Sequence, residues 1–181
     1  MTPRFDPTRA IVYDLAQGQL RDDEGSSRLN LPVDLLARLL EQAGPQATSD
    51  FAASLGTELG RRVADRMGET AVGASVEAWA EHLGGQVALL GLGNLSVEQW
   101  GKALILRVAG APQGMTGVLT LLLQSALQRA LGRDVRLLHF DGKEGAGFLV
   151  VAPSTAQRAQ SLVDGGASLG QVVEQLHQGD A

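Results

Sequence analysis

A row of small side chains in the stretch 51-FAASLGTELGRRVADRMG-68 is the feature that most constrains the fold. Its members recur at every fourth position and are Ala52, Gly56, Gly60 and Ala64. Residues four apart share one face of an α-helix, so this small-residue row forms a smooth strip along a helix. Glycine inside a helix costs about 1 kcal/mol relative to alanine. Two glycines on one face therefore indicate that another helix approaches closely there.

Two interpretations of the small-residue row are open. The approaching helix can belong to the same chain, which gives a tight intrachain crossing. It can also belong to a second copy of the chain, which gives a homodimer contact. We therefore take the four residues of the row as candidates for helix packing or for a dimer interface.

The apolar pattern predicts three further helices around this one, of which one begins near Ser75 and has Trp79 and Leu83 on its buried face. Leucines one helical turn apart predict a helix over residues 33–43, which Gly44-Pro45 would stop. Ser49 or Asp50 would then cap the helix that carries the small-residue row. The segment 118–131 is apolar nearly all round and predicts a buried central helix.

Short apolar runs between turn residues predict strands at 95–97, 103–108, 135–140 and 148–151. The polar tip 141-DGKEGAG-147 joins the last two strands, and Gly101-Lys102 joins the first two. Such short connections imply antiparallel pairing. Because the helices are grouped and do not alternate with the strands, the fold class is α+β.

The chain divides into three parts. Residues 1–31 predict a lead-in and a β-hairpin, in which 10–13 would pair with 28–31. Residues 32–152 hold the α+β domain. Residues 153–181 predict a helical appendage, with capping-box spacing at Ser154 and Ser168.

Composition excludes several classes of function. The chain has 181 residues and no cysteine, which rules out disulfides, cysteine-ligated metals and cysteine nucleophiles. Its net charge of −5 argues against a nucleic-acid surface. No apolar run approaches the roughly 20 residues that span a bilayer, and the N-terminus has no signal pattern. We expect a cytoplasmic protein without a membrane span.

No motif assembles a catalytic site. Gly91-Leu-Gly93 is followed by a strand and not by a helix, so it predicts a helix stop and not a dinucleotide loop. Ser168, in a G-x-S-x-G match, lacks the preceding strand of a nucleophile elbow and predicts a helix cap. The three histidines, His82, His139 and His177, lack metal-binding spacing. We expect no enzyme, no metal and no cofactor.

Two charged clusters are most simply interpreted as solvent-exposed surface. Asp22-Asp23-Glu24 lacks the spacing of a calcium loop and predicts a solvated turn. Arg61, Arg62 and Arg66 form a basic patch on the helix of the small-residue row, for which an acidic partner or ligand is the alternative.

Three segments together resemble the four-vinyl-reductase domain family, which is related to the TRAPP vesicle-tethering subunits. They are 51-FAASLGTELGRRVADRMG-68, 83-LGGQVALLGLGNLSVEQWGKALILRV-108 and 119-LTLLLQSALQRALGRDVRLLHF-140. The resemblance implies a TRAPP-like α+β fold, with helices packed on one side of an antiparallel sheet, and dimerisation through helices. Family members often carry metal-associated cysteines in the closing hairpin. The segment 137-LLHFDGKEGAGFLV-150 has none, so no metal site is carried over.

The main functional hypothesis is a non-enzymatic, homodimeric scaffold or adaptor domain. It would mediate protein–protein interaction, with a partner of unknown identity, in a bacterial regulatory or assembly system. The alternative is a small-molecule sensor with a pocket for a hydrophobic ligand between the helices and the sheet. The candidate pocket residues are Trp100, Leu119, Leu122, Leu123 and Phe148.

Overall fold

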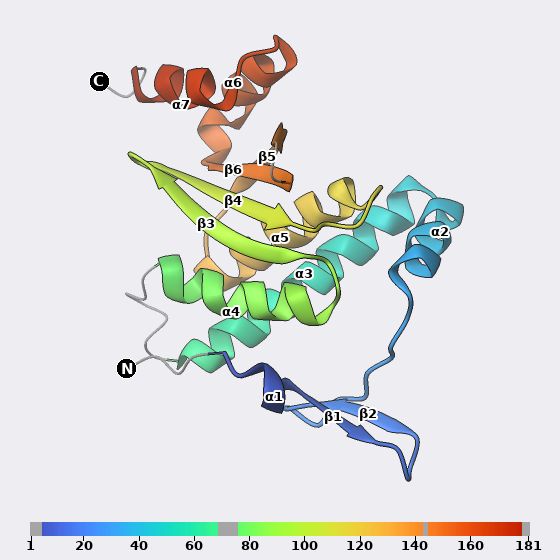
Figure 1. The fold of residues 1–181 in the computed structure, drawn as a ribbon. Helices are drawn as coiled ribbons and strands as arrows, with labels where there is room; N and C mark the ends of the chain where they lie inside the picture. The colour runs from blue at the N-terminus through green and yellow to red at the C-terminus, as the bar shows by residue number, and fades with distance from the viewer. Residues whose placement is uncertain (1–4, 69–75, 143–144, 179–181) are drawn as a thin grey trace.

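The computed structural model describes residues 5–68, 76–142 and 145–178 (Figure 1). A four-stranded sheet lies at the centre of the molecule. Helices cover one of its faces, a terminal helix pair lies on the other, and the N-terminal hairpin lies beyond the helices.

The N-terminal hairpin differs from the predicted one. The short helix α1 (Pro7–Ala10) leads into β1 (Ile11–Asp14), which pairs with β2 (Gln19–Asp22). The predicted partner, 28–31, is therefore wrong, because β1 pairs with residues 19–22 instead. The early reversal is possible because Gly18 adopts a φ of 64°, a conformation that glycine tolerates at little cost.

The first two long helices follow the predicted order. Helix α2 (Val33–Ala43) has the predicted bounds, and α3 (Pro45–Met67) carries the small-residue row. The predicted cap at Ser49 or Asp50 is wrong because α3 begins at Pro45. Proline suits a first helical position, where its missing N–H would be unpaired in any case. Gly44, with a φ of 88°, joins the two helices.

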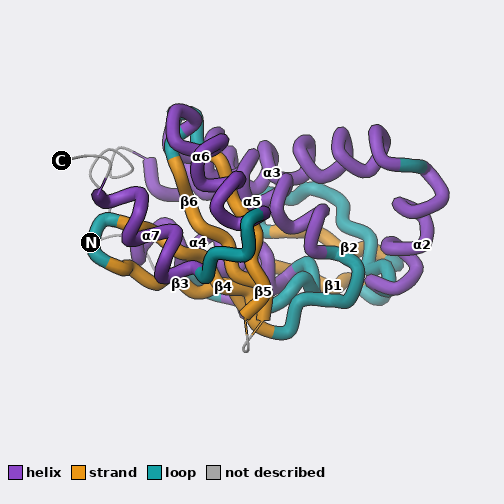
Figure 2. The backbone as a smooth tube through the Cα atoms, turned by 90° about the horizontal axis from the view of Figure 1, so that it is seen from above, coloured by secondary structure: helices purple, strands orange, loops and turns teal. Residues whose placement is uncertain are grey.

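The small-residue row lies against α5 (Thr116–Leu131) of the same chain, and the two helices run side by side in both ribbon views (Figures 1 and 2). A Cβ added to Gly56 would lie 2.2 Å from the backbone oxygen of Leu122. A Cβ added to Gly60 would lie 2.3 Å from the backbone oxygen of Ala126. The crossing is therefore intrachain and brings backbone against backbone. Ala52 is fully buried and Ala64 half-buried within the chain, so a dimer would have to form through other surfaces.

Two hairpins form the main sheet. β3 (Asn94–Trp100) pairs with β4 (Ala103–Ala109), and β5 (Arg136–Gly142) pairs with β6 (Gly145–Val151). β4 and β6 pair in the middle, which gives the antiparallel order β3-β4-β6-β5. Before β3, α4 (Val76–Leu89) ends at the turn of Gly91 and Gly93, which both have positive φ. This turn is the predicted helix stop.

Alternation along the strands separates two apolar clusters. Leu106 and Phe148 point into the cluster shared with α3, α4 and α5. Ile105 and Leu149, one residue away on the same strands, point into a cluster shared with α6 (Pro153–Asp164) and α7 (Leu169–Gln178). The α+β class with an antiparallel sheet is confirmed. The appendage adds helices on the second face of the sheet.

An ion-pair cluster fastens the N-terminal hairpin to α3. The Arg62 guanidinium is buried and donates to Asp22 at 2.6 Å and to Glu58 at 2.8 Å. Arg28 donates to the same Asp22 carboxylate at 2.8 Å, and Arg66 pairs with Asp23. The prediction of a solvated turn at Asp22 is wrong, because this carboxylate is buried beneath its arginine partners. The acidic partners of the basic patch are therefore carboxylates of the same chain.

The cluster lowers the pKa of two carboxyl groups. Burial raises the pKa of Asp22, but hydrogen bonds from Arg62 and the Ser26 N–H, with the charges of Arg62 and Arg28, outweigh it and hold the pKa below its usual range. The pKa of Glu58 is lowered to about 2, mainly by hydrogen bonding from Arg61. Burial opposes this shift, and Arg62 adds to it through its own hydrogen bond and charge. Both carboxylates are therefore charged at neutral pH.

Candidate functional site

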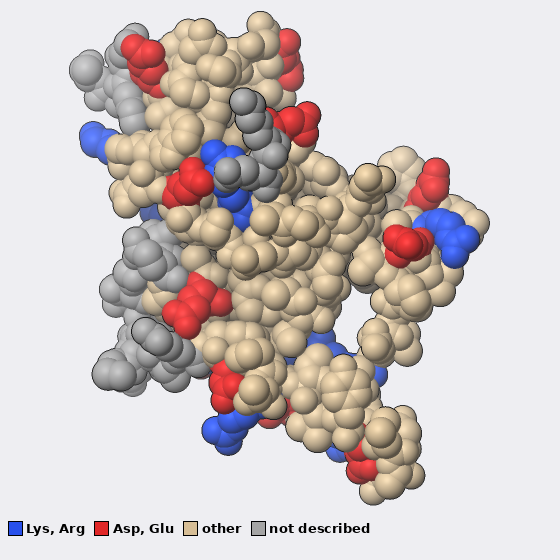
Figure 3. Space-filling view, in the orientation of Figure 1, with Lys and Arg blue, Asp and Glu red and all other residues tan. Residues whose placement is uncertain are grey.

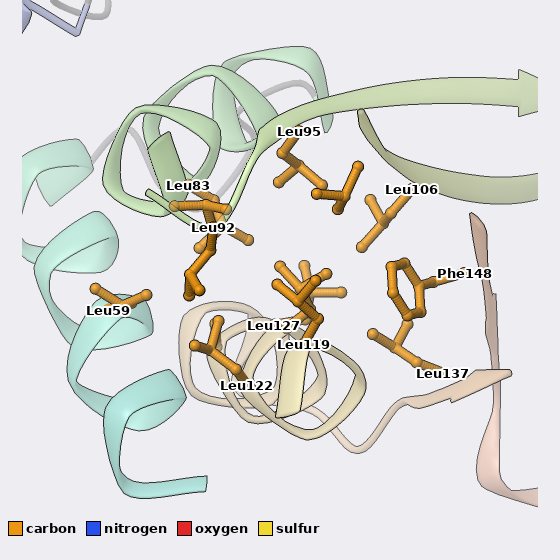
Figure 4. Close-up of a cluster of buried hydrophobic side chains, with 14 of the residues drawn as sticks. Leu59, Leu83, Leu92, Leu95, Leu106, Leu119, Leu122, Leu127, Leu137 and Phe148 are labelled. Atoms are coloured by element: carbon orange, nitrogen blue, oxygen red, sulfur yellow. The ribbon is translucent and has the colours of Figure 1, made fainter. Parts of the chain in front are cut away.

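The predicted pocket residues do not line an open pocket. Leu119, Leu122, Leu123 and Phe148 are each fully buried and pack into the main apolar cluster (Figure 4). In the close-up, Leu119 and Leu122 of α5 point towards the sheet and α3, and Phe148 fills the space from β6. These four residues are core residues, because their side chains occupy the volume that a ligand would need.

Trp100 lies apart from these four residues. It is the last residue of β3 and is 40% exposed. Its indole Nε1 donates to Glu98 at 3.2 Å, and Glu98 also accepts a 2.5 Å hydrogen bond from Arg107. Its place as a pocket residue is therefore not supported by the structure.

An apolar cavity of about 50 Å³ does lie between the helices and the sheet. We call it the α4–α5 cavity. Its wall comprises Trp79, Ala80 and Leu83 of α4, Leu95 and Val97 of β3, Leu104 and Leu106 of β4, and Leu127, Leu131 and Arg133 at the end of α5. Trp79 is 6% exposed, so the largest side chain of the wall is itself buried.

The α4–α5 cavity is lined by elements that also carry the predicted pocket residues, but by other residues of those elements. Leu127 lies one helical turn beyond Leu123 on α5. Leu106 is the strand neighbour of Phe148 in the β4–β6 register. The small side chain of Ala80 and the half-buried Leu131 leave the space open, whereas the larger side chains around Leu119 fill theirs.

The described residues offer no alternative site for metal chemistry. Across residues 5–68, 76–142 and 145–178, no three histidine or acidic side chains gather as a metal ion would require. The ring of His82 is buried and meets Phe5 edge-on, with 6.5 Å between centroids. His139 packs beside Phe148, and the side chain of His177 lies outside the described part of the structure. None of the described helices combines the length and apolar character that crossing a membrane requires.

The fold has a counterpart among solved structures. No family model and no curated protein matches the sequence. The structure is similar to a crystal structure of the phenol-responsive sensory domain of the transcription activator PoxR with phenol. The TM-score is 0.59 at 11% sequence identity, and the similarity covers 79% of this chain and 85% of that chain. The likeness supports the predicted TRAPP-like α+β fold.

The scaffold hypothesis is corrected by these findings. The structural neighbour is a sensory domain and favours the alternative of small-molecule sensing over a homodimeric scaffold or adaptor. The small-residue row, which would have formed the scaffold's dimer interface, is occupied by α5 of the same chain. The main functional prediction is therefore wrong.

Proposed function

We propose that this chain is a small-molecule sensing domain that binds a small apolar or aromatic molecule at the α4–α5 cavity. The observation that carries the proposal is an apolar cavity with a buried tryptophan, in a fold shared with a phenol-responsive domain. Binding, and not catalysis, would be its activity. The same fold and the resembling segments support membership of the four-vinyl-reductase domain family.

Ligand entry would require the outer wall of the cavity to move. A volume of about 50 Å³ holds little more than a water-sized group, so an aromatic ring needs more room. The wall residues near the surface are Leu104, Leu131 and Arg133, of which the first two are half-buried and Arg133 is exposed. Displacing these side chains enlarges the cavity without disturbing the α3–α5 crossing. The ligand would then contact α4 directly, and α4 would report its presence.

Filling the cavity tests the proposal. Ala80 lines it, and Ala80→Leu adds three carbon atoms where the ligand would lie. We expect phenol and toluene to bind the wild-type chain in isothermal titration calorimetry, and we expect Ala80→Leu to weaken that binding at least tenfold. Thermal unfolding of each variant without ligand establishes that it is folded.

The control is Ala88→Leu, which makes the same change at an exposed position of the same helix. It should bind both compounds as the wild type does. Equal binding by Ala80→Leu and wild type would place the ligand elsewhere, and an absence of binding by the wild type would contradict the proposal.

We also propose that the chain forms a homodimer through β1. Within the described residues, β1 pairs only with β2, so its outer edge is open to a strand from a second copy. Val12 and Tyr13 on this strand are 56% and 63% exposed, and Leu15 beside it is 88% exposed. A two-fold pairing of β1 with its counterpart would satisfy the open edge of both copies and bring these side chains beside those of the second copy.

A charge on this surface should disrupt the dimer. Val12→Glu would bring two carboxylates together across a two-fold interface and lower the apparent mass in sedimentation velocity from that of a dimer to that of a monomer. Gln113→Glu adds the same charge in an exposed loop away from the hairpin and should leave the mass unchanged. A wild-type chain that sediments as a monomer at micromolar concentration would refute the dimer.

A further inference from the structure

We propose a second binding site, beneath the N-terminal hairpin, for a neutral small molecule that joins an apolar body to one hydrogen-bonding group such as an amide. The site is a pocket of about 370 Å³ between the hairpin and helices α2, α3 and α4. This volume lies in the range of small-molecule sites in proteins. In Figure 3 the surface is hollowed between the hairpin, at the bottom, and α2, at the right. This hairpin pocket is distinct from the α4–α5 cavity.

The side chain of Gln86 supplies the polar recognition group. It lines the hairpin pocket, and only 4% of the residue is exposed. Its amide group makes no hydrogen bond to another described residue, and its polar atoms are not fully enclosed, so they reach the pocket. Buried amides are nearly always hydrogen-bonded, because leaving one unpaired is unfavourable. Gln86 therefore presents a donor and an acceptor to whatever occupies the pocket, and a ligand amide or hydroxyl group would complement them.

The walls around Gln86 are apolar on the helix side. Leu36 comes from α2, Leu89 is the last residue of α4, and Leu90 follows it. Leu20 lines the same pocket from the hairpin. These four leucines offer apolar surface to the body of a ligand, and the amide of Gln86 lines the same pocket.

The charged groups of the pocket favour a neutral ligand. Asp22, Asp23, Arg28 and Arg62 line it, so two negative and two positive groups balance. They are also paired already, since Arg28 and Arg62 share Asp22, and Arg66 pairs with Asp23. A charged ligand would lose its hydration without gaining an unpaired opposite charge.

The test compares two probes that differ only in their head group. 4-Phenylbutanamide has a neutral amide, and 4-phenylbutanoate has a carboxylate on the same apolar body. We expect the full chain to bind the amide at least tenfold more tightly than the carboxylate, as measured by isothermal titration calorimetry at pH 7. Gln86→Leu should weaken amide binding at least tenfold, because leucine keeps the size of the side chain but forms no hydrogen bond.

The melting temperature of the Gln86→Leu variant shows whether weaker binding comes from a lost contact with the ligand or from a loss of folding. We expect ligand-free Gln86→Leu to melt at or above the wild-type temperature, because the variant removes a largely buried amide that makes no hydrogen bond to a described residue. Gln99→Leu, at an exposed position of β3, is the matched control and should bind the amide normally. Ala80→Leu should also bind the amide normally, which separates this site from the proposed aromatic site.

Three results would overturn the inference. They are an absence of saturable amide binding by the wild type at millimolar concentration, equal affinity for the two probes, and unchanged amide binding by a folded Gln86→Leu variant. A melting temperature of Gln86→Leu below that of the wild type would also count against it, because Gln86 would then be a structural residue.

Discussion

Replacing Gly56 by alanine is expected to destabilise the protein by about 3 kcal/mol or more, at the upper end of what overpacking usually costs. The added Cβ would lie 2.2 Å from the backbone oxygen of Leu122 and 2.9 Å from its carbonyl carbon. A flexible side chain could rotate away, but a backbone atom moves only if α5 moves with it. Helix α5 supplies much of the main apolar cluster, so its displacement would loosen that cluster. Urea unfolding followed by circular dichroism measures the loss.

Gly117→Ala is the matched control for this prediction. Gly117 lies in the first turn of α5, it is exposed, and a Cβ added there meets no atom within 4 Å. Alanine loses less conformational entropy than glycine in a helix, so we expect a gain of up to about 0.5–1 kcal/mol. The sign of the effect should therefore differ between two glycine-to-alanine changes in one helix pair. A Gly56→Ala variant as stable as the wild type would show that the two helices are further apart than the structure places them.

Replacing Arg62 by methionine is expected to cost about 3 kcal/mol, the lower end of the range for breaking a buried ion pair. The Asp22 side chain is only 3% exposed and would lose its 2.6 Å partner. Arg28 remains beside it, which keeps the cost from being larger. Because Asp22 belongs to the hairpin and Arg62 to α3, the change should also release the hairpin. Amide hydrogen exchange of residues 11–22 would show this release as lost protection.

Arg61→Met provides the comparison on the same helix. The Arg61 side chain is 36% exposed and pairs with Glu24, Glu58 and Asp65. Exposed ion pairs contribute about 0–1 kcal/mol, so this variant should remain within that range of the wild type. If both arginine variants lost the same stability, burial of the Arg62–Asp22 pair would not be the cause.

Arg62→Met should also differ from the wild type in its response to acid. The pKa of Glu58 is lowered from 4.5 to about 2, and the pKa of Asp22 is also lowered. A carboxyl group whose pKa is lower in the folded protein stabilises it above the unfolded pKa, and that contribution is lost as pH falls through the folded pKa. Wild-type stability should therefore fall between about pH 4.5 and 2. The fall should be smaller in Arg62→Met, which has already lost part of this contribution.

Much of the fold follows from apolar periodicity and from glycine. Helix α2 and the end of α5 at Gly132 lie where the spacing of leucines and the following glycine place them. The two sheet hairpins also follow from alternation and turn residues. The N-terminal hairpin was mispredicted because β2 is short and polar, and its position depends on the contact between Asp22 and Arg62. A contact across so many residues leaves no local pattern in the sequence.

The candidate sites were harder to predict for a related reason. Leu123 and Leu127 are one turn apart on the same face of α5, yet only Leu127 lines the α4–α5 cavity. The difference comes from how completely the facing side chains fill the space, which periodicity does not specify. Gln86 looks like an ordinary polar helix residue in the sequence. Its burial arises from packing between elements that lie far apart in the sequence, which the local pattern does not show.

The backbone contact between α3 and α5 also determines which positions of the sequence can be substituted without loss of the fold. A leucine in the apolar cluster can exchange with another residue of similar volume, because neighbouring side chains readjust. Gly56 and Gly60 have no such freedom, since carbonyl oxygens occupy the space of their missing side chains. A few positions of this kind are enough to hold an architecture while nearly every other residue is replaced. Such a difference between positions is consistent with a fold that two chains share at 11% sequence identity.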